Sequence, residues 1–205
     1  MALAAVHAMA HGEHVDDDIL LFLDRAIAAV EPVVESVSVA DHVRSTPCKG
    51  FDLGALVAHL VGGLRGFADV GEGKPLRFDA DPDLKTERAG VEYRKASDRL
   101  VAAFREPGML ERSFAMPWGD TTGAQLIGFE LIEVVVHGWD ISRSLGRTAP
   151  FDDDLVEAAL FGARLWVDDS TRTPQLFGPE VPVSAGAPAL DRLVGFLGRQ
   201  PDWGL

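Results

Sequence analysis

Apolar residues recur along much of the chain at the three- and four-residue spacing of amphipathic α-helices. The clearest example lies between residues 53 and 67, where one helix face would carry Leu53, Leu56, Val57, Leu60, Val61 and Leu64. The same pattern predicts further helices at residues 16–38, 83–104, 122–144, 152–166 and 189–197. Residues 109–120 are too many for a tight turn between helices, and we expect an extended or hairpin connection there.

Polar residues, glycine and proline mark the ends of several predicted helices. Asp52 can cap the second helix, and Thr122 with Gln125 three residues later matches a capping box at the start of the fourth. Gly146 is expected to stop the fourth helix, whereas Pro32 is expected to kink or divide the first. Four long helices with one long connection between the third and the fourth predict an all-α four-helix bundle with a crossover connection, followed by a short C-terminal extension.

The composition suits one such bundle. A chain of 205 residues with 47% hydrophobic content can bury one sizeable core, so we expect a single domain over residues 16–205 behind a flexible tail of residues 1–15. The tail has no Lys or Arg and no long apolar run, which excludes a secretory signal. We also expect no membrane-spanning helix, because no uninterrupted apolar stretch approaches the roughly 18 residues that one needs.

Charge and cysteine content exclude several further classes of protein. The 19 Lys and Arg against 32 Asp and Glu give a net charge of −13, which argues against nucleic acid and anionic membranes as partners. This balance favours a soluble cytoplasmic protein. The single cysteine, Cys48, excludes a disulfide framework and a multi-cysteine zinc site. We expect Cys48 to pack as a small apolar residue.

The predicted helix at residues 122–144 is apolar on nearly every side, so it should be buried. At about 100° per residue, its polar side chains gather in a stripe about 80° wide. This stripe contains Glu130, Glu133, His137, Asp140 and Ser144. Burying carboxylates and an imidazole is costly unless they pair or bind a metal, so the stripe is a candidate site. The alternative is the solvated face of an ordinary amphipathic helix.

A metal site would need a further ligand from another helix. His59 is the best candidate, because His42 is expected just past the end of the first helix. On its own helix His59 lies about 130° from the centre of the apolar face, which suits the rim of a pocket and equally suits plain exposure. Gly62 and Gly63, one turn away, each cost about 1 kcal/mol relative to alanine, and space for a metal would compensate. Close packing of two helices at these glycines, with His59 as a bridging polar residue, is the alternative.

Several short motifs resemble those of a known family. TPCKGFD at residues 46–52 and LVAHLVGG at residues 56–63 are similar to the start of the mycothiol-dependent maleylpyruvate isomerase N-terminal family, one of the DinB-like metal-binding bundles of actinobacteria. PWG and VHGWD match its later motifs, at residues 117–119 and 136–140. The end of the chain resembles a shorter metal-binding subgroup through FGP, APALDRL and GR, at residues 177–179, 187–193 and 198–199. The resemblance covers roughly residues 20–203.

This resemblance implies a DinB-like four-helix bundle in which a histidine of the second helix and a Glu/His pair of the fourth hold a divalent metal. Carried over by position, the ligands are His59, Glu133 and His137, which the spacing of the residues had also singled out. The second, sterol-carrier-like domain of the isomerase is not expected, because the chain ends at Leu205. Isomerisation of maleylpyruvate itself is therefore in question.

Two imidazoles and one carboxylate would leave a divalent ion at least one open coordination position, as in catalytic zinc sites. Zinc suits these ligands best, and nickel, manganese or iron are alternatives. In the related thiol-transferases the open position would bind a low-molecular-weight thiol as thiolate. We therefore expect a thiol-dependent transferase or isomerase that uses mycothiol on a small electrophile. A water ligand activated for hydrolysis is another use of such a site.

Two further functions stay open at this stage. A non-catalytic metal-binding or stress-related module would close the site with a fourth protein ligand, for which Glu130 and Asp140 are the obvious donors. A metal-free helical domain would instead use the polar stripe as a buried hydrogen-bond network or as the face of a homodimer.

Residues next to the candidate ligands have more than one interpretation. Asp140 can orient the ring of His137, but we favour a hydrogen bond to a neighbouring loop. Glu130 can act as a ligand or base, but we favour a solvated carboxylate near the start of the helix. Trp118 and Trp139 are candidates for lining a pocket, although aromatic residues beside a helix more often belong to the core.

Overall fold

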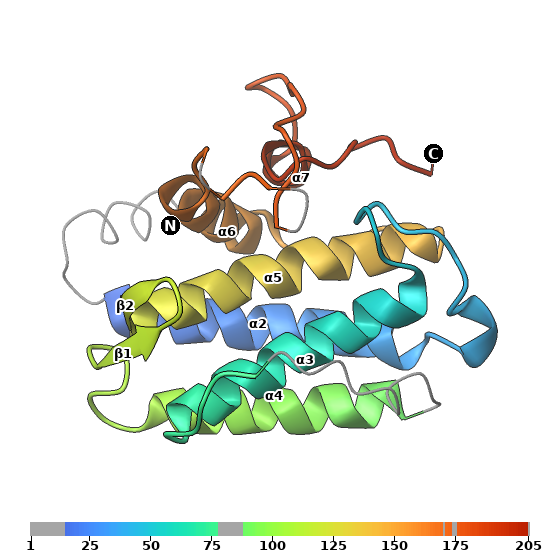
Figure 1. The fold of residues 1–205 in the computed structure, drawn as a ribbon. Coiled ribbons are helices and arrows are strands. Elements are labelled where there is room, and N and C mark those ends of the chain that lie inside the picture. The colour runs from blue at the N-terminus through green and yellow to red at the C-terminus, as the bar shows by residue number, and fades with distance from the viewer. Residues whose placement is uncertain (1–14, 78–87, 170, 174–175, 205) are drawn as a thin grey trace.

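The computed structural model describes residues 15–77, 88–169, 171–173 and 176–204 of the chain. In this part of the chain, four long helices form a bundle (Figure 1). They are α2 (Val15–Glu35), α3 (Leu53–Gly71), α4 (Ala89–Arg105) and α5 (Gly123–Ser144). The predicted all-α bundle is confirmed.

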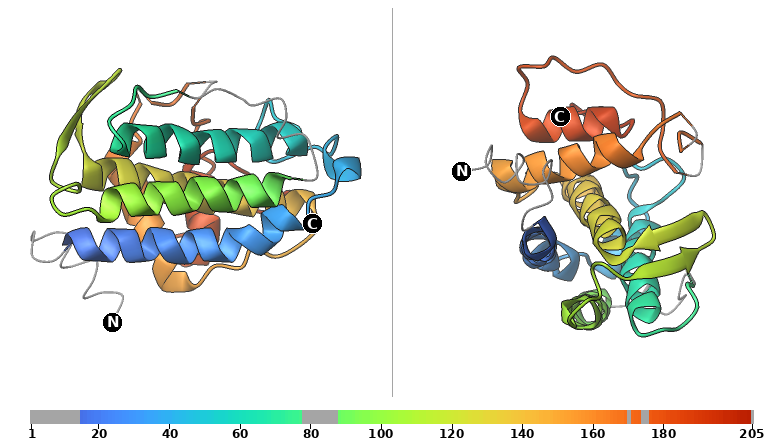
Figure 2. Two further views of the ribbon diagram at one scale, coloured as in Figure 1. Left: turned by 90° about the horizontal axis from the view of Figure 1, so that it is seen from below. Right: turned by 90° about the vertical axis from the view of Figure 1, so that its left-hand side faces the viewer.

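Shorter elements complete the described structure. A 3-10 turn, η1 (Val39–Asp41), and an irregular loop join α2 to α3. Between α4 and α5 lies the predicted hairpin, in which β1 (Ser113–Met116) pairs antiparallel with β2 (Gly119–Thr122). Outside the bundle, α6 (Asp153–Trp166) packs against α5 and α7 (Ala189–Phe196) packs against α6 (Figure 2). These last two helices form the predicted C-terminal extension.

Side chains at the helix ends explain where the bundle helices begin. At the start of α3, Asp52 accepts a hydrogen bond from the backbone N–H of Ala55 at 2.8 Å. At the start of α5, Thr122 and Gln125 form the predicted capping box, in which each side chain accepts the backbone N–H of the other residue. After α5, Gly146 adopts a φ of 70°, a left-handed conformation that favours glycine and ends the helix.

Some helix boundaries differ from the prediction. The second helix runs to Gly71 rather than to residue 67, because further apolar residues continue its buried face. The first helix is not divided at Pro32. The predicted start of the third helix at residue 83 lies outside the described residues, as does the tail predicted over residues 1–15 except for its last residue.

The helix α5 is enclosed by three others. In Figure 2, α2, α3 and α6 surround it, and each of them packs against it. Its central apolar side chains are at most 1% exposed: Leu131, Ile132, Val134, Val135 and Val136. Water therefore has little access to the polar residues that α5 carries, and this packing creates the environment of the candidate site.

The helix α3 is long and apolar enough, by length and composition alone, to cross a membrane, and it is the one such helix among the described residues. It passes by its mean hydropathy and is not an uninterrupted apolar run, because it contains Arg65 and Asp69. Buried residues make up 72% of its most apolar window. Both α4 and α5 pack against it, so its apolar surface belongs to the core of the bundle.

Replacing either of two glycines of α5 by alanine tests how tightly the first turn of this helix is packed. A Cβ on Gly123 would lie 2.0 Å from the carbonyl oxygen of Met109, whereas nothing lies within 4 Å of a Cβ on Gly128. We expect Gly123→Ala to lower the free energy of unfolding by about 1–3 kcal/mol, because the backbone at Met109 must shift. Gly128→Ala should raise it by up to about 1 kcal/mol, because alanine favours a helix. Urea unfolding measures both, and equal effects would contradict this packing.

Candidate metal centre

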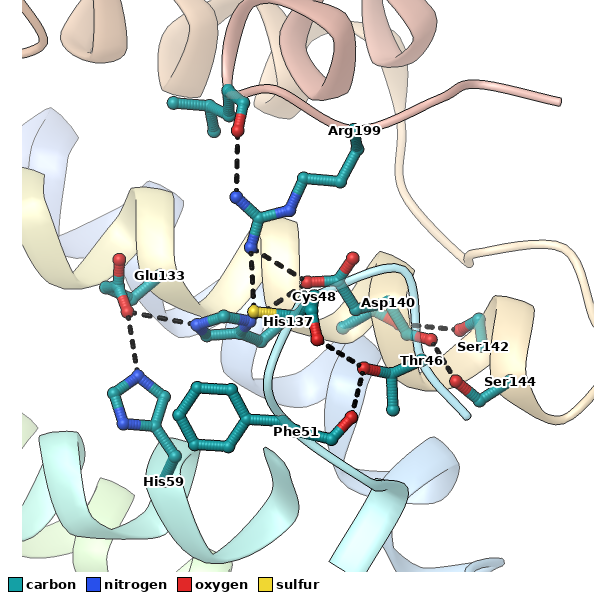
Figure 3. Close-up of polar contacts among 12 residues, drawn as sticks. Thr46, Cys48, Phe51, His59, Glu133, His137, Asp140, Ser142, Ser144 and Arg199 are labelled. Atoms are coloured by element: carbon teal, nitrogen blue, oxygen red, sulfur yellow. Dashed lines mark hydrogen bonds and ion pairs between the residues drawn. The ribbon is translucent and has the colours of Figure 1, made fainter. Parts of the chain in front are cut away.

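The side chains of His59, Glu133 and His137 lie together between α3 and α5 (Figure 3). The Nε2 atom of His137 is 3.2 Å from Oε2 of Glu133, one turn earlier on the same helix. The Nε2 atom of His59, which comes from α3, is 3.5 Å from the same oxygen. The ligand atoms of all three residues lie within 4.8 Å of one another. The structure thus brings together the three residues that the sequence singles out.

These separations suit a metal ion. Ligand atoms bound about 2.0–2.1 Å from a tetrahedral zinc ion stand about 3.3 Å apart. The two measured nitrogen–oxygen distances, 3.2 and 3.5 Å, lie on either side of that value. Two imidazole nitrogens and one carboxylate oxygen are also a ligand set that divalent zinc accepts. The residues present therefore fit a divalent cation.

Exposure changes steeply across this group of residues. The side chain of His137 is 5% exposed, that of Glu133 is 19% exposed and that of His59 is 39% exposed. The ring of Phe51 packs against His59 with a centroid distance of 5.1 Å. His59 therefore lies at the rim, as its helical position allowed, and the site is reached from solvent on the side of α3.

Asp140 orients the ring of His137 from behind. Its Oδ2 atom accepts a hydrogen bond from Nδ1 of His137 at 3.0 Å, which leaves Nε2 of that ring facing Glu133. The favoured interpretation of Asp140, a hydrogen bond to a neighbouring loop, misses this contact with His137. The same oxygen also accepts a hydrogen bond from Arg199 in the C-terminal extension.

The charges of neighbouring groups set the pKa values within the site. Burial alone would lower the pKa of His137, but the carboxylates of Glu133 and Asp140 outweigh burial and raise this pKa to about 9. Burial alone would raise the pKa of Glu133, but His137 and His59 outweigh it and hold this pKa well below its usual range. Without a cation, a proton on His137 links the ring to Glu133. A metal ion would take the place of that proton.

Glu130 is buried, which corrects the prediction of a solvated carboxylate. It is 0% exposed, and neither of its carboxyl oxygens has a hydrogen-bond partner among the described residues. It faces Gly63 of α3, where a Cβ would lie 3.6 Å from a Glu130 oxygen, an ordinary van der Waals contact. Burial, and then the charge of Glu133, raise the pKa of Glu130 well above its usual value. Burial therefore favours the neutral form of Glu130.

The two tryptophans considered as pocket residues lie elsewhere. Trp118 is 57% exposed at the turn of the hairpin, where its indole N–H donates to Thr121 at 3.1 Å. The structure thus gives no support to a place for Trp118 in the pocket. Trp139 is buried in an apolar cluster with Ala149 and Val194, as expected for a core residue.

Cys48 and Arg199 adjoin the candidate ligands. The Nη2 atom of Arg199 donates to the sulfur of Cys48 at 3.4 Å. Burial raises the pKa of the Cys48 thiol to about 11, which suits the packing role predicted for it. Cys48 also forms a second group of closely spaced ligand atoms with His137 and Asp140. Sequence reasoning gave Arg199 no place in the site, although it belongs to the GR motif at residues 198–199 on which the resemblance partly rests.

The pH dependence of stability can test the burial of Glu130. Because the pKa of Glu130 is higher in the folded protein than in the unfolded chain, the folded state keeps a proton that the unfolded state loses above about pH 4.3. Stability contributed by this group therefore falls as pH rises. Relative to wild type, we expect Glu130→Gln to gain stability steadily from about pH 5 to about pH 8 in chemical denaturation. The exposed Glu106→Gln controls for loss of one charge, and parallel pH profiles of wild type and Glu130→Gln would contradict a buried neutral acid.

Similarity to known proteins agrees with this fold. Two uncharacterized proteins of Mycobacterium tuberculosis, from strains CDC 1551 and H37Rv, are each 27% identical to the chain over 183 residues, which cover 89% of this chain and 98% of each relative. The crystal structure of the mycothiol-dependent maleylpyruvate isomerase has a similar fold, with a TM-score of 0.53 and 14% identity over 70% of this chain and 67% of that one. Residues 23–142, more than half of the chain, match the mycothiol maleylpyruvate isomerase N-terminal domain, so the chain belongs to that family.

Proposed function

We propose that this protein binds a divalent metal, zinc in the first place, through His59, Glu133 and His137. We further propose that it is a thiol-dependent transferase or isomerase, with mycothiol as the thiol and a small electrophile as the second substrate. The observation that carries the proposal is the convergence of two imidazole nitrogens on one carboxylate oxygen at a site that is open on one side. The family, whose name includes mycothiol, supports the choice of thiol.

The arrangement of the remaining carboxylates favours a catalytic site over a closed one. A closed site would take a fourth ligand from Glu130 or Asp140. Asp140 instead accepts hydrogen bonds from His137 and Arg199. Glu130 lies against Gly63 and is not among the described residues whose ligand atoms cluster. Three protein ligands with a position left open is the arrangement of catalytic zinc sites.

Each residue of the site has a distinct task in this proposal. A divalent ion, when bound, lowers the pKa of a thiol so that it is present as thiolate at neutral pH. Glu133 supplies the one negative charge among the ligands, so a divalent ion held with two neutral imidazoles would keep one net positive charge and favour an anionic ligand. Asp140 holds the His137 ring in place, and the half-exposed His59 leaves room for a small molecule at the rim.

The charge of the chain is consistent with small-molecule partners. A net charge of −13 disfavours nucleic acid and anionic membranes, both of which attract basic surfaces. We therefore propose a cytoplasmic protein whose partners are a low-molecular-weight thiol and an electrophile.

Removing a ligand should remove the metal. We expect wild-type protein without a histidine tag to hold about one zinc ion per chain and His59→Ala or His137→Ala to hold close to none, because two ligands bind zinc far more weakly than three. His42→Ala, which lies outside the cluster, is the matched control and should keep the wild-type amount. Elemental analysis after dialysis measures the stoichiometry, with circular dichroism to confirm folding. Full zinc content in His137→Ala would show that the ligands are wrongly assigned.

Thiol binding at the open position can be observed without knowing the electrophile. We expect cobalt-substituted protein to develop a sulfur-to-cobalt charge-transfer absorption in the near ultraviolet when mycothiol is added, because a thiolate would become a ligand. Cys48→Ala should behave like wild type, which excludes the protein's own thiol as the source. An unchanged spectrum at saturating mycothiol would contradict the proposed thiol chemistry while leaving metal binding intact.

A further inference from the structure

A buried arginine connects the C-terminal extension to the candidate metal ligands. Arg199 follows α7 and is 6% exposed. Its Nη2 atom donates to Oδ2 of Asp140 at 3.1 Å, and its Nη1 atom donates to the carbonyl oxygen of Leu197 at 2.9 Å. The same Oδ2 atom accepts the hydrogen bond from Nδ1 of His137. A continuous series of hydrogen bonds therefore runs from the extension to a candidate ligand (Figure 3).

Burial determines what Arg199 can do. A guanidinium that is almost wholly enclosed cannot bind a substrate at the rim, so any effect on the site must pass through the groups that Arg199 contacts. Asp140 is itself 0% exposed, and its other oxygen, Oδ1, has no hydrogen-bond partner in the described part of the chain. A buried carboxylate that loses a paired cation becomes strongly unfavourable and changes its conformation or its partners. The orientation of Asp140 thus depends on Arg199.

We propose that Arg199 is a positioning residue of the metal centre. By pairing with Asp140, it fixes the carboxylate that directs Nδ1 of His137 away from the metal and Nε2 towards it. This inference rests on the proposed function, because it requires a metal at His59, Glu133 and His137. It also extends the site beyond residues 23–142, which match the family, to a segment at the C-terminal end of the chain. The C-terminal extension then forms part of the centre and does more than cover α5.

Arg172 offers a matched control for this role. Its Nη1 atom donates to the carbonyl oxygens of Gly178 and Phe196, both at 2.9 Å, so this arginine also fastens the extension. Its hydrogen bonds among the described residues do not reach Asp140 or His137. Loss of Arg172 should therefore loosen the same segment without disturbing the carboxylate behind His137.

The test compares the zinc affinity of wild type, Arg199→Met, Arg199→Lys and Arg172→Met by competition with a chelating indicator. We expect Arg199→Met to weaken zinc binding by about 10- to 100-fold, the usual effect of losing a partner behind a ligating histidine. Arg199→Lys should recover part of this affinity, because lysine restores the positive charge but lacks the planar guanidinium group. Arg172→Met should bind zinc as wild type does, even if thermal unfolding shows a similar loss of stability.

The outcomes separate this inference from the function on which it rests. Equal loss of affinity in Arg199→Met and Arg172→Met would show that Arg199 only fastens the extension, and wild-type affinity in Arg199→Met would also overturn the proposal. If Arg199→Met does not fold, Arg199→Lys decides, since wild-type affinity in that variant would overturn the proposal that the guanidinium of Arg199 holds Asp140 in place. Absence of zinc binding by wild type would refute the proposed function together with this inference. In proton NMR spectra of the zinc-loaded protein, the signal of the Nδ1 proton of His137 should keep its chemical shift in Arg172→Met and change it in Arg199→Lys.

Discussion

Enclosure of polar side chains within an apolar helix is the constraint on which the rest of the structure depends. The helix α5 is surrounded by α2, α3 and α6, yet it carries Glu130, Glu133, His137 and Asp140 on one stripe. A buried carboxylate or imidazole is tolerated only when a neighbour supplies a hydrogen bond or an opposite charge. Three of these residues meet that requirement by pairing in series, and the series ends on α3 and on the C-terminal extension. Glu130 does not meet it, because neither of its carboxyl oxygens has a hydrogen-bond partner among the described residues, and burial accordingly raises its pKa.

The elements that enclose α5 also supply what its stripe lacks. One face of α3 presents His59 to Glu133 and, one turn later, the bare backbone of Gly63 to Glu130. His59 and Glu133 are partly exposed, at 39% and 19%, whereas Glu130 is fully buried. At the other end of the stripe, Arg199 closes the site with a buried positive charge. Of the three candidate ligands, His59 on α3 is the most exposed to solvent.

Patterns among residues close together in the sequence predicted the helices and the candidate ligands. Features that depend on a segment far away in the chain were not predicted. The capping box at Thr122 and the spacing of the polar stripe depend on residues within one or two helical turns, so regular helix geometry was sufficient. The burial of Glu130 was missed, because a stripe does not reveal which element faces it, and the residue that faces Glu130, Gly63, belongs to another helix. The role of Arg199 was missed, because irregular residues such as 176–187 determine where the last segment returns to α5.

The candidate ligands come from helices that are far apart in the chain, and, if an ion binds there, this separation would link metal supply to the lifetime of the protein. The imidazoles of α3 and α5 meet only after the bundle has formed, so an ion held between them binds the native chain in preference to the unfolded one. Such binding adds native-state stability that grows with the logarithm of the free ion concentration. In a cell depleted of the ion, the chain would unfold more often and be degraded faster by proteases. Ion availability would then regulate the abundance of the protein as well as its chemistry.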